Sequence, residues 1–450
     1  MIEAFQSFIR ENRLLASGDR VVVAFSGGAD STCLLHLLSQ TGHEIVAAHL
    51  HHGQRPHAEA DVEHCRTFCE TLDISFYVGQ ANVPVVAAAR KIGVEEMGRE
   101  LRYEFFQMIA SKGFERIATG HTMDDSVESM LFNLVRGAGM KGLTGIPVKR
   151  ENIIRPISFA RRQETAEYCR EHGLKYVQDS FNEDESFARN RIRKQVIPIL
   201  EKINASTIYH AASTGKILTE EDALLDGLAG THLAANEIPK LGPLAFIESR
   251  LGAEWRSLDA LPIALVRRCI RIAVAMYGAK LDQVATQSLA EAIHRREKSS
   301  FTAEGGSVSV TTDGDGWSVR QLDKPESFRQ MLTLPGETIA DEFGWSISAW
   351  RGRAESGPLE GELDAELIRG DLYARSLVPG DKIDPPGRGS LKPLAERLAR
   401  AGASEALRSR LPVVCDMIGP VWAPLVGADR RASRDAELER SIGLRLGPIA

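Results

Sequence analysis

A chain of 450 residues, 43% hydrophobic and 26% charged, has enough apolar material for a sizeable core and for about three domains. Its formal net charge of -6 excludes a globally basic nucleic-acid-binding protein, so any surface for nucleic acid has to be a local patch. We expect neither a signal peptide nor a membrane span. The six cysteines form no Cys-x-x-Cys pair, which is typical of reduced thiols and favours a cytoplasmic protein.

The first 200 residues alternate strand-like and helix-like stretches. Apolar runs predict buried strands at residues 21–25, 45–49, 74–78, 117–119 and 153–154. Apolar residues spaced by three and four predict helices through residues 34–38, 62–72, 94–108, 127–135 and 161–172. Strands buried on both faces with intervening helices indicate an α/β fold with a doubly wound parallel sheet. Ligands of such sheets bind beyond the carboxyl ends of the strands.

The rest of the chain has a different composition and a different hydrophobic pattern. Residues from about 200 to 295 are rich in Ala and Leu and predict helices, whereas 307–311 and 317–319 flank an Asp-Gly-Asp-Gly turn and predict a hairpin. The Gly- and Pro-rich segment 330–450 favours a small α+β domain. We therefore expect a catalytic α/β domain over 1–203, a mostly helical middle domain over 204–328 and a small α+β domain over 329–450.

The loop Ser26-Gly27-Gly28-Ala29-Asp30-Ser31 lies directly between the first predicted strand and its helix. Glycines let backbone N–H groups approach an anion, and the first N–H groups of a helix lack internal partners and carry partial positive charge. Ser26 and Ser31 add hydroxyl donors, so the loop predicts a cradle for phosphate. Asp30 cannot attract phosphate by its charge, and we expect it to hold Mg²⁺ or a cationic co-substrate.

Two other glycine patterns are excluded as nucleotide sites. Gly215-Lys216 is followed by Ile217, so it lacks the Ser or Thr of a Walker loop. The run from Gly137 to Gly142 fits G-x-G-x-x-G but follows a helix instead of a strand, which is the wrong context for dinucleotide binding. A glycine-rich loop that closes over the active site is the better interpretation of that run.

The phosphate loop resembles the PP-loop signature of the N-type ATP pyrophosphatases, and further motifs resemble those of the tRNA(Ile)-lysidine synthetases within that superfamily. These motifs are His49-Leu50-His51-His52-Gly53, Gly98 to Tyr103, Gly120 to Ser129, Arg136 to Gly139, Asp179-Ser180-Phe181-Asn182 and Arg189 to Arg193. The resemblance is specific over residues 20–200 and looser beyond. Its departures at His51, Ser129 and Val177 leave the ATP chemistry untouched.

The resemblance implies a ligase that forms a carbon–nitrogen bond. ATP adenylates the wobble cytidine of tRNA(Ile), anticodon CAU, at its 2-oxo group and releases pyrophosphate. The ε-amine of free L-lysine then attacks C2 and AMP leaves, which gives lysidine. The resemblance also implies Mg²⁺ and places tRNA contacts in the middle and C-terminal domains. The oligomeric state stays open, a homodimer included.

Three carboxylates, Asp124, Asp125 and Glu128, lie within one helical turn and follow His121. Such a group near a triphosphate could hold Mg²⁺, grip a lysine ammonium or deprotonate it, since a free lysine amine titrates near about 10.4. We expect catalytic roles for Asp30, His121, Asp125 and Glu128, the last three also binding lysine. Asp124 and Asp125 would equally suit a role in stabilising the helix N-terminus.

Basic residues supply the remaining candidates. Arg99 and Arg102 are candidates for contacts with phosphates or the AMP leaving group, and His49 for lining the nucleotide pocket. A basic run is predicted to contact tRNA phosphates or the active site: Arg189, Asn190, Arg191, Arg193 and Lys194, with Arg155, Arg161 and Arg162 upstream.

Three other functions compete with this interpretation. A tRNA thiolase of the same superfamily generally needs a persulfide cysteine or a cysteine-held cluster, and this chain lacks a Cys-x-x-Cys pair. An amide-forming NAD or GMP synthetase would normally bring a glutaminase domain or an ammonia supply. A non-catalytic nucleotide sensor would not need the carboxylate cluster.

Overall fold

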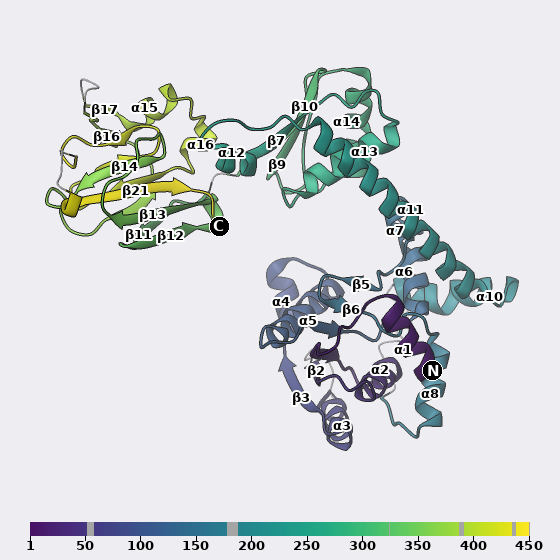
Figure 1. Ribbon diagram of the computed structural model, residues 1–450. Coiled ribbons are helices and arrows are strands. Elements are labelled where there is room, and N and C mark those ends of the chain that lie inside the picture. The colour runs from purple at the N-terminus through teal and green to yellow at the C-terminus, as the bar shows by residue number, and fades with distance from the viewer. Residues whose placement is uncertain (52–57, 178–187, 324, 387–390, 434–437, 450) are drawn as a thin grey trace. The chain divides into compact units, whose positions relative to one another are not determined.

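The computed structural model describes residues 1–450 except 52–57, 178–187, 324, 387–390, 434–437 and 450. The chain divides into two compact units, Met1–Ala223 and Leu224–Ala450 (Figure 1). Within the described residues, no helix combines the length and the apolar character that crossing a membrane requires.

The first unit is built on a six-stranded sheet in the order β3-β2-β1-β4-β6-β5. Its strands are β1 (Val21–Ala24), β2 (Ile45–His51), β3 (Ser75–Gln80), β4 (Arg116–Ala118), β5 (Lys149–Arg150) and β6 (Ile153–Ile154). Neighbouring strands run parallel, except that β5 pairs antiparallel with β6. The parallel sheet and its five predicted strands are confirmed, whereas the edge strand β5 was not predicted.

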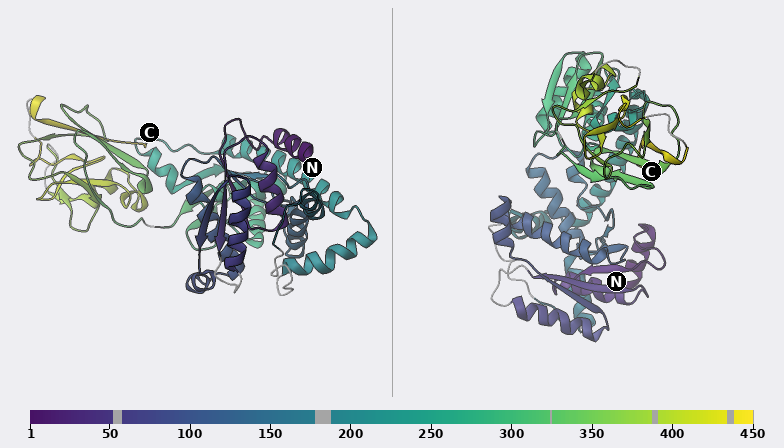
Figure 2. Two further views of the ribbon diagram at one scale, coloured as in Figure 1. Left: turned by 90° about the horizontal axis from the view of Figure 1, so that it is seen from below. Right: turned by 90° about the vertical axis from the view of Figure 1, so that its left-hand side faces the viewer.

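Helices lie on both faces of this sheet (Figures 1 and 2). The helices of the first unit are α1 (Ile2–Glu11), α2 (Ala29–Ser39), α3 (Ala58–Thr71), α4 (Val83–Arg90), α5 (Val94–Ala110), α6 (Met123–Val135), α7 (Met140–Leu143), α8 (Arg162–Glu171), α9 (Ala188–Arg191), the π-helical turn η2 (Ile192–Val196), α10 (Ile197–Ile203) and α11 (Thr207–Asn236), which contains the division between the units.

Strand β1 shows why both faces are covered. Val21 and Val23 are buried in one core with residues of α1, α2, α3 and α8, whereas Val22 is buried in a second core with Phe106 and Ile109 of α5. Because side chains alternate along a strand, a run of apolar residues has to be covered on both sides. The apolar pattern therefore leads to a layered α/β unit in which helices cover both faces of the sheet. The ends of the strands remain available for a binding site.

The second unit begins with helices packed on a four-stranded antiparallel sheet, β7-β10-β9-β8. Its elements are α12 (Ala245–Leu251), β7 (Gly252–Arg256), α13 (Ile263–Ala275), α14 (Gln283–Arg295), β8 (Ser299–Thr302), β9 (Val308–Thr312) and β10 (Gly316–Gln321). The predicted hairpin is confirmed as β9 and β10. The mostly helical prediction missed β7 and β8, which join that hairpin into a sheet.

The C-terminal part is rich in strands, with a five-stranded sheet β11-β15-β18-β19-β20, a four-stranded sheet β12-β13-β21-β14 and the pair β16-β17. Its elements are β11 (Arg329–Met331), β12 (Gly336–Ala340), η3 (Asp341–Phe343), β13 (Trp345–Arg351), β14 (Glu360–Asp364), β15 (Tyr373–Ser376), β16 (Lys382–Ile383), β17 (Lys392–Pro393), α15 (Leu394–Arg400), α16 (Glu405–Arg408), β18 (Pro412–Cys415), β19 (Pro420–Ala423), β20 (Gly427–Ala428), η4 (Leu438–Arg440) and β21 (Ser441–Gly447). The predicted boundaries near residues 203 and 328 stay a prediction.

Candidate active site

The predicted phosphate loop follows β1 and leads into α2. Gly27 has a φ of 82°, and a Cβ there would lie 2.9 Å from the Cys65 Sγ, so this position requires glycine. The Ser31 hydroxyl donates to the Gly28 carbonyl at 3.0 Å and lies 3.0 Å from the Ser26 Oγ. Val177 donates its backbone N–H to the Gly27 carbonyl at 2.8 Å, a contact that does not depend on its side chain. These bonds hold the loop at the N-terminus of α2.

The end of β4 meets the same loop through Gly120. A Cβ on Gly120 would lie 3.2 Å from both the N and the Cα of Ser31, so the two backbones are in close contact. The next residue, His121, has its Nδ1 2.8 Å from the Thr119 Oγ1. Burial lowers the pKa of His121 to about 4, although Asp125 attracts the proton, so the imidazole is neutral near pH 7.

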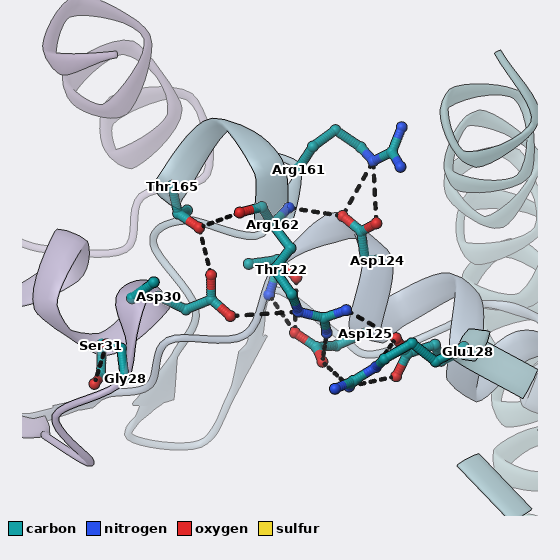
Figure 3. Close-up of polar contacts among 12 residues, drawn as sticks. Gly28, Asp30, Ser31, Thr122, Asp124, Asp125, Glu128, Arg161, Arg162 and Thr165 are labelled. Carbon is teal, nitrogen blue, oxygen red and sulfur yellow. Dashed lines mark hydrogen bonds and ion pairs between the residues drawn. The ribbon is translucent and has the colours of Figure 1, made fainter. Parts of the chain in front are cut away.

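Arg162, the first residue of α8, binds three of the predicted catalytic carboxylates (Figure 3). Its Nη2 lies 2.6 Å from the Asp125 Oδ1, its Nη1 lies 3.1 Å from the Glu128 Oε1, and its Nε lies 3.6 Å from the Asp30 Oδ2. Burial would lower the pKa of Arg162, but these carboxylates raise it above its ordinary value. The sequence predicted that this arginine contacts either tRNA phosphates or the active site, and its guanidinium lies among the predicted catalytic carboxylates.

Arg193, from the π-helical turn η2, is a second guanidinium in this cluster. Its Nε and Nη2 donate to the two oxygens of Glu128 at 2.6 and 2.8 Å, and its Nη2 lies 3.4 Å from the Asp125 Oδ1. Three carboxylates, Asp30 included, and two guanidinium groups leave one net negative charge. A cavity of about 420 Å³ lies beside this cluster, lined among others by Glu128, Arg162 and Arg193.

Asp30 and Asp125 have opposite electrostatic surroundings. Burial raises the pKa of Asp30 to about 6, despite a short hydrogen bond from the Thr165 hydroxyl and the attraction of Arg162. Burial would also raise the pKa of Asp125, but Arg162 and His121 hold it below its ordinary value. Asp125 therefore stays ionised near neutral pH, whereas Asp30 titrates close to it.

Asp124 and Asp125 also stabilise helix ends, as the alternative interpretation expected. The Asp125 Oδ2 accepts hydrogen bonds from the N and the Oγ1 of Thr122, both at 2.8 Å, and so closes a capping box on α6. Asp124 accepts from the Arg161 Nε at 3.1 Å and from the Arg162 N at 2.8 Å. Arg161 is thus paired inside the protein, and Asp124 ties α6 to the start of α8.

The remaining predicted residues lie around this centre. The His49 Nδ1 is 2.9 Å from the Phe25 carbonyl, so its ring joins β2 to the residue before the phosphate loop. Burial lowers the pKa of His49, although the bond to Phe25 opposes this, so its ring is also neutral. The positive charges of Arg99 and Arg102 of α5 contribute to lowering the pKa of His121.

The basic run is divided in the structure. Arg189 of α9 lies over the Phe132 ring at 5.6 Å, and Asn190 follows it on the same helix, whereas Arg193 points into the carboxylate cluster. The motif residues His52, Gly53 and 179–182 lie outside the described residues.

Comparison with known proteins adds the family. A family model described as a PP-loop domain matches residues 2–200. The tRNA(Ile)-lysidine synthase of Symbiobacterium thermophilum is 33% identical over 97% of this chain and 95% of its own length. The chain belongs to the tRNA(Ile)-lysidine synthase family. Synthases of Porphyromonas gingivalis (30% identical, 95% of this chain and 94% of the relative) and Pseudothermotoga lettingae (37%, 94% and 90%) are similarly related.

For this member of the tRNA(Ile)-lysidine synthase family, sequence reasoning missed the hydroxyl of Thr165 and the pairing role of Arg162. A signal was present, since the two residues are three apart at the start of a predicted helix and so share a face. Their partner Asp30 could not be identified, because it is more than 130 residues away.

In this member of the tRNA(Ile)-lysidine synthase family, Asp30 is the residue that the sequence predicted to hold Mg²⁺ or a cationic co-substrate. In the described part of the chain, no group of three or more His, Cys, Asp or Glu side chains is arranged to hold a metal ion. A Mg²⁺ ion that arrives with a triphosphate needs few protein ligands, because phosphate oxygens and water complete its shell. The single carboxylate of Asp30 beside the phosphate loop fits that requirement.

Proposed function

We propose that this protein uses ATP to ligate lysine to C2 of the wobble cytidine of tRNA(Ile), forming lysidine. The observation that carries the proposal is the arginine network that joins Asp30 of the phosphate loop to Asp125 and Glu128. It joins the predicted phosphate loop to the carboxylate cluster, in a chain similar along nearly its whole length to synthases of this name.

The first step is adenylation. Backbone amides of residues 26–31 and the N-terminus of α2 hold the phosphates, so that the 2-oxo oxygen of the cytosine can attack the α-phosphorus. An O–P bond forms, the bond between the α- and β-phosphates breaks, and pyrophosphate leaves. Mg²⁺ held by Asp30 would neutralise charge on the leaving pyrophosphate.

The second step is attack by lysine. The ε-nitrogen forms a bond to C2, the C2–O bond breaks, and AMP leaves with the oxygen. The cluster favours this step because its net negative charge attracts an ammonium, and Asp125 and Glu128 supply acceptor oxygens. The attacking amine must lose a proton, and Asp30, whose pKa is raised to about 6, is the better acceptor of the two aspartates.

Lysine would have to compete with the protein's own arginines. Arg193 already occupies both oxygens of Glu128. A lysine ammonium that binds Glu128 therefore displaces or shares that guanidinium.

The test is pyrophosphate release by the full chain with ATP, lysine and tRNA(Ile), followed by mass analysis of the digested tRNA. We expect release that depends on both substrates and a nucleoside with the mass of lysidine. Release with a sulfur donor or with ammonia, but never with lysine, would instead support a thiolase or an amide-forming synthetase. ATP binding without any release would support a nucleotide sensor.

A further inference from the structure

Arg155 follows β6 at the carboxyl-terminal edge of the sheet. Ile154 pairs with Ala118 of β4, and the Thr119 N–H donates to the Ile154 carbonyl at 3.0 Å, so Arg155 stands beside the residues that lead to His121. Ile153 packs in the core that contains α5, whereas Ile154 packs in the opposite core. By alternation, the Arg155 side chain lies on the α5 side of the sheet.

The Arg155 guanidinium is buried without a carboxylate partner among the described residues. Its side chain is only 3% exposed; Nη1 donates to the Pro147 carbonyl, and the buried Nε has no hydrogen-bond partner. Arg161 and Arg162, only six and seven residues further along, are each paired with carboxylates. Burying an unpaired charge costs free energy, and an anion that reached this guanidinium from outside the protein would offset that cost.

The neighbours of Arg155 are themselves cationic. Tyr103 of α5 lies against the Arg155 side chain and favours its charged form, but burial, Arg99 and Arg150 lower the pKa of Arg155 below its ordinary value. Arg99 stands one helical turn before Tyr103, with its guanidinium 5.7 Å from the centre of that ring.

Arg102 completes the group, because it acts on His121 together with Arg99 and Arg155. Arg99 and Arg102 belong to α5, which packs in the same core as Ile153 of β6. The phosphate loop leads into α2, which packs in the opposite core.

We infer that Arg155 is the buried positioning residue of a second oxyanion subsite, completed by Arg99 and Arg102, that takes a phosphoryl group of the substrates. The inference rests on the proposed function, in which one phosphoryl group stays on the base after pyrophosphate has left the phosphate loop. That group needs cationic partners of its own. The nucleotide α-phosphate and a backbone phosphate of the tRNA share this chemistry, and the experiment separates them.

The test compares Arg155→Met and Arg155→Lys in the full chain, with Arg150→Met as a control that removes a neighbouring exposed arginine. Calorimetry measures binding of AMP, of pyrophosphate and of tRNA alone. We expect Arg155→Met to weaken AMP by about 10- to 100-fold, Arg155→Lys to restore part of this, and pyrophosphate to change less than about twofold. The apparent melting temperature without ligand should be equal or higher, because an unpaired buried charge is gone.

Each outcome of the binding experiment has a separate interpretation. Weaker tRNA binding with unchanged AMP binding assigns the subsite to a backbone phosphate, whereas unchanged binding of both overturns the inference. Should Arg155→Met not fold, Tyr103→Phe takes its place, since it removes the hydroxyl beside Arg155 and keeps the ring under Arg99. Unchanged binding of both AMP and tRNA by Tyr103→Phe would also overturn the inference.

The proposed function can fail independently of this subsite. A wild-type enzyme without lysine-dependent turnover, but with AMP binding that depends on Arg155, would remove the function and keep the subsite. Lysidine formation at wild-type kcat and KM in Arg155→Met would remove the subsite and keep the function.

Discussion

Asp30 and Asp125 are the same kind of residue and share one arginine, yet their surroundings shift their pKa values in opposite directions. Among the described residues, the cationic partner of Asp30 is Arg162, whose Nε is 3.6 Å away, whereas Asp125 has the same guanidinium at 2.6 Å and a capping box as well. We therefore expect Asp125 to bind a cation as an ionised carboxylate, and Asp30 to exchange a proton or bind a cation.

This difference predicts a pH dependence. The pKa of Asp30 is raised to about 6, so its ionised form is lost as the pH falls through 6. We expect kcat/KM for ATP, which reports the free enzyme, to fall with a midpoint near pH 6. In Asp30→Asn the same quantity should be at least about 100-fold lower and flat in that window. Because the pKa of His121 is about 4, it does not titrate there. An unchanged midpoint in Asp30→Asn would remove Asp30 from this role.

Arg193 offers a second test at the scale of one residue. The family resemblance predicts that Arg193→Ala weakens tRNA use more than ATP binding, and its bonds to Glu128 predict that the KM for lysine also changes. Steady-state KM values for the three substrates check this, with Lys202→Ala on α10 as an exposed control. We expect the KM for ATP to change less than about twofold. The prediction fails if the ATP value changes while the tRNA and lysine values do not.

At the scale of single residues, the sequence predicts some parts of the site and not others. The loop from Ser26 to Ser31 was found because its residues are contiguous and their spacing has a physical meaning. The partners of Arg162 and Arg193 were not found, because they are 34 to 132 residues away and a charge run looks the same whether it is exposed or paired. The burial of Arg155 was hidden for the same reason.

At the scale of elements, α8 is held on the site by its first turn. Its backbone N–H at Arg162 bonds to Asp124 of α6, and the Arg162 side chain reaches both α2 and α6. Further along, Tyr168 of α8 bonds to His36 of α2 at 2.8 Å. These contacts with α2 and α6 hold α8 in place, and α8 in turn positions the Arg162 guanidinium.

Removing Arg162 should therefore destabilise the first unit. Arg162→Met leaves Asp125 and Glu128 buried with one arginine fewer, which costs roughly 3 kcal/mol. Arg170→Met on the same helix removes an exposed arginine and should cost close to nothing. Because all five tryptophans lie between residues 255 and 422, their fluorescence reports only the second unit. We expect an earlier transition by far-UV circular dichroism with the tryptophan transition unchanged; equal effects of the two substitutions would contradict this.

Elements were predicted where periodicity was strong and missed where tertiary contacts decide. Strands of the parallel sheet are continuous apolar runs, and the hairpin has both alternation and a turn. Strand β5 has two exposed charged residues and exists only because β6 offers an edge. Helix α4 was overlooked although Asn82 caps it and a proline stands in its first turn, a signal that could have been used.

The whole molecule has a net charge of -6, so binding of a polyanion depends on where its basic residues gather. In the second unit, Lys392, Arg397 and Arg400 line a cavity of about 350 Å³ with one acidic residue, Glu396. Composition alone could not locate this group, although its basic residues all come from the consecutive elements β17 and α15. The family resemblance placed tRNA contacts in this region, and this cavity is a specific candidate for one.

The salt dependence of tRNA binding tests that candidate. Each phosphate contact that is lost makes the slope of log affinity against log salt less steep by about 1, so Lys392→Ala with Arg400→Ala should reduce the slope by about 2. The KM for ATP should stay unchanged, since the phosphate loop belongs to the first unit. As a control, Arg440→Ala with Arg445→Ala removes the same charge from arginines of the second unit that do not line this cavity. A slope that falls equally in both double variants would mean that tRNA responds to overall charge and not to this cavity.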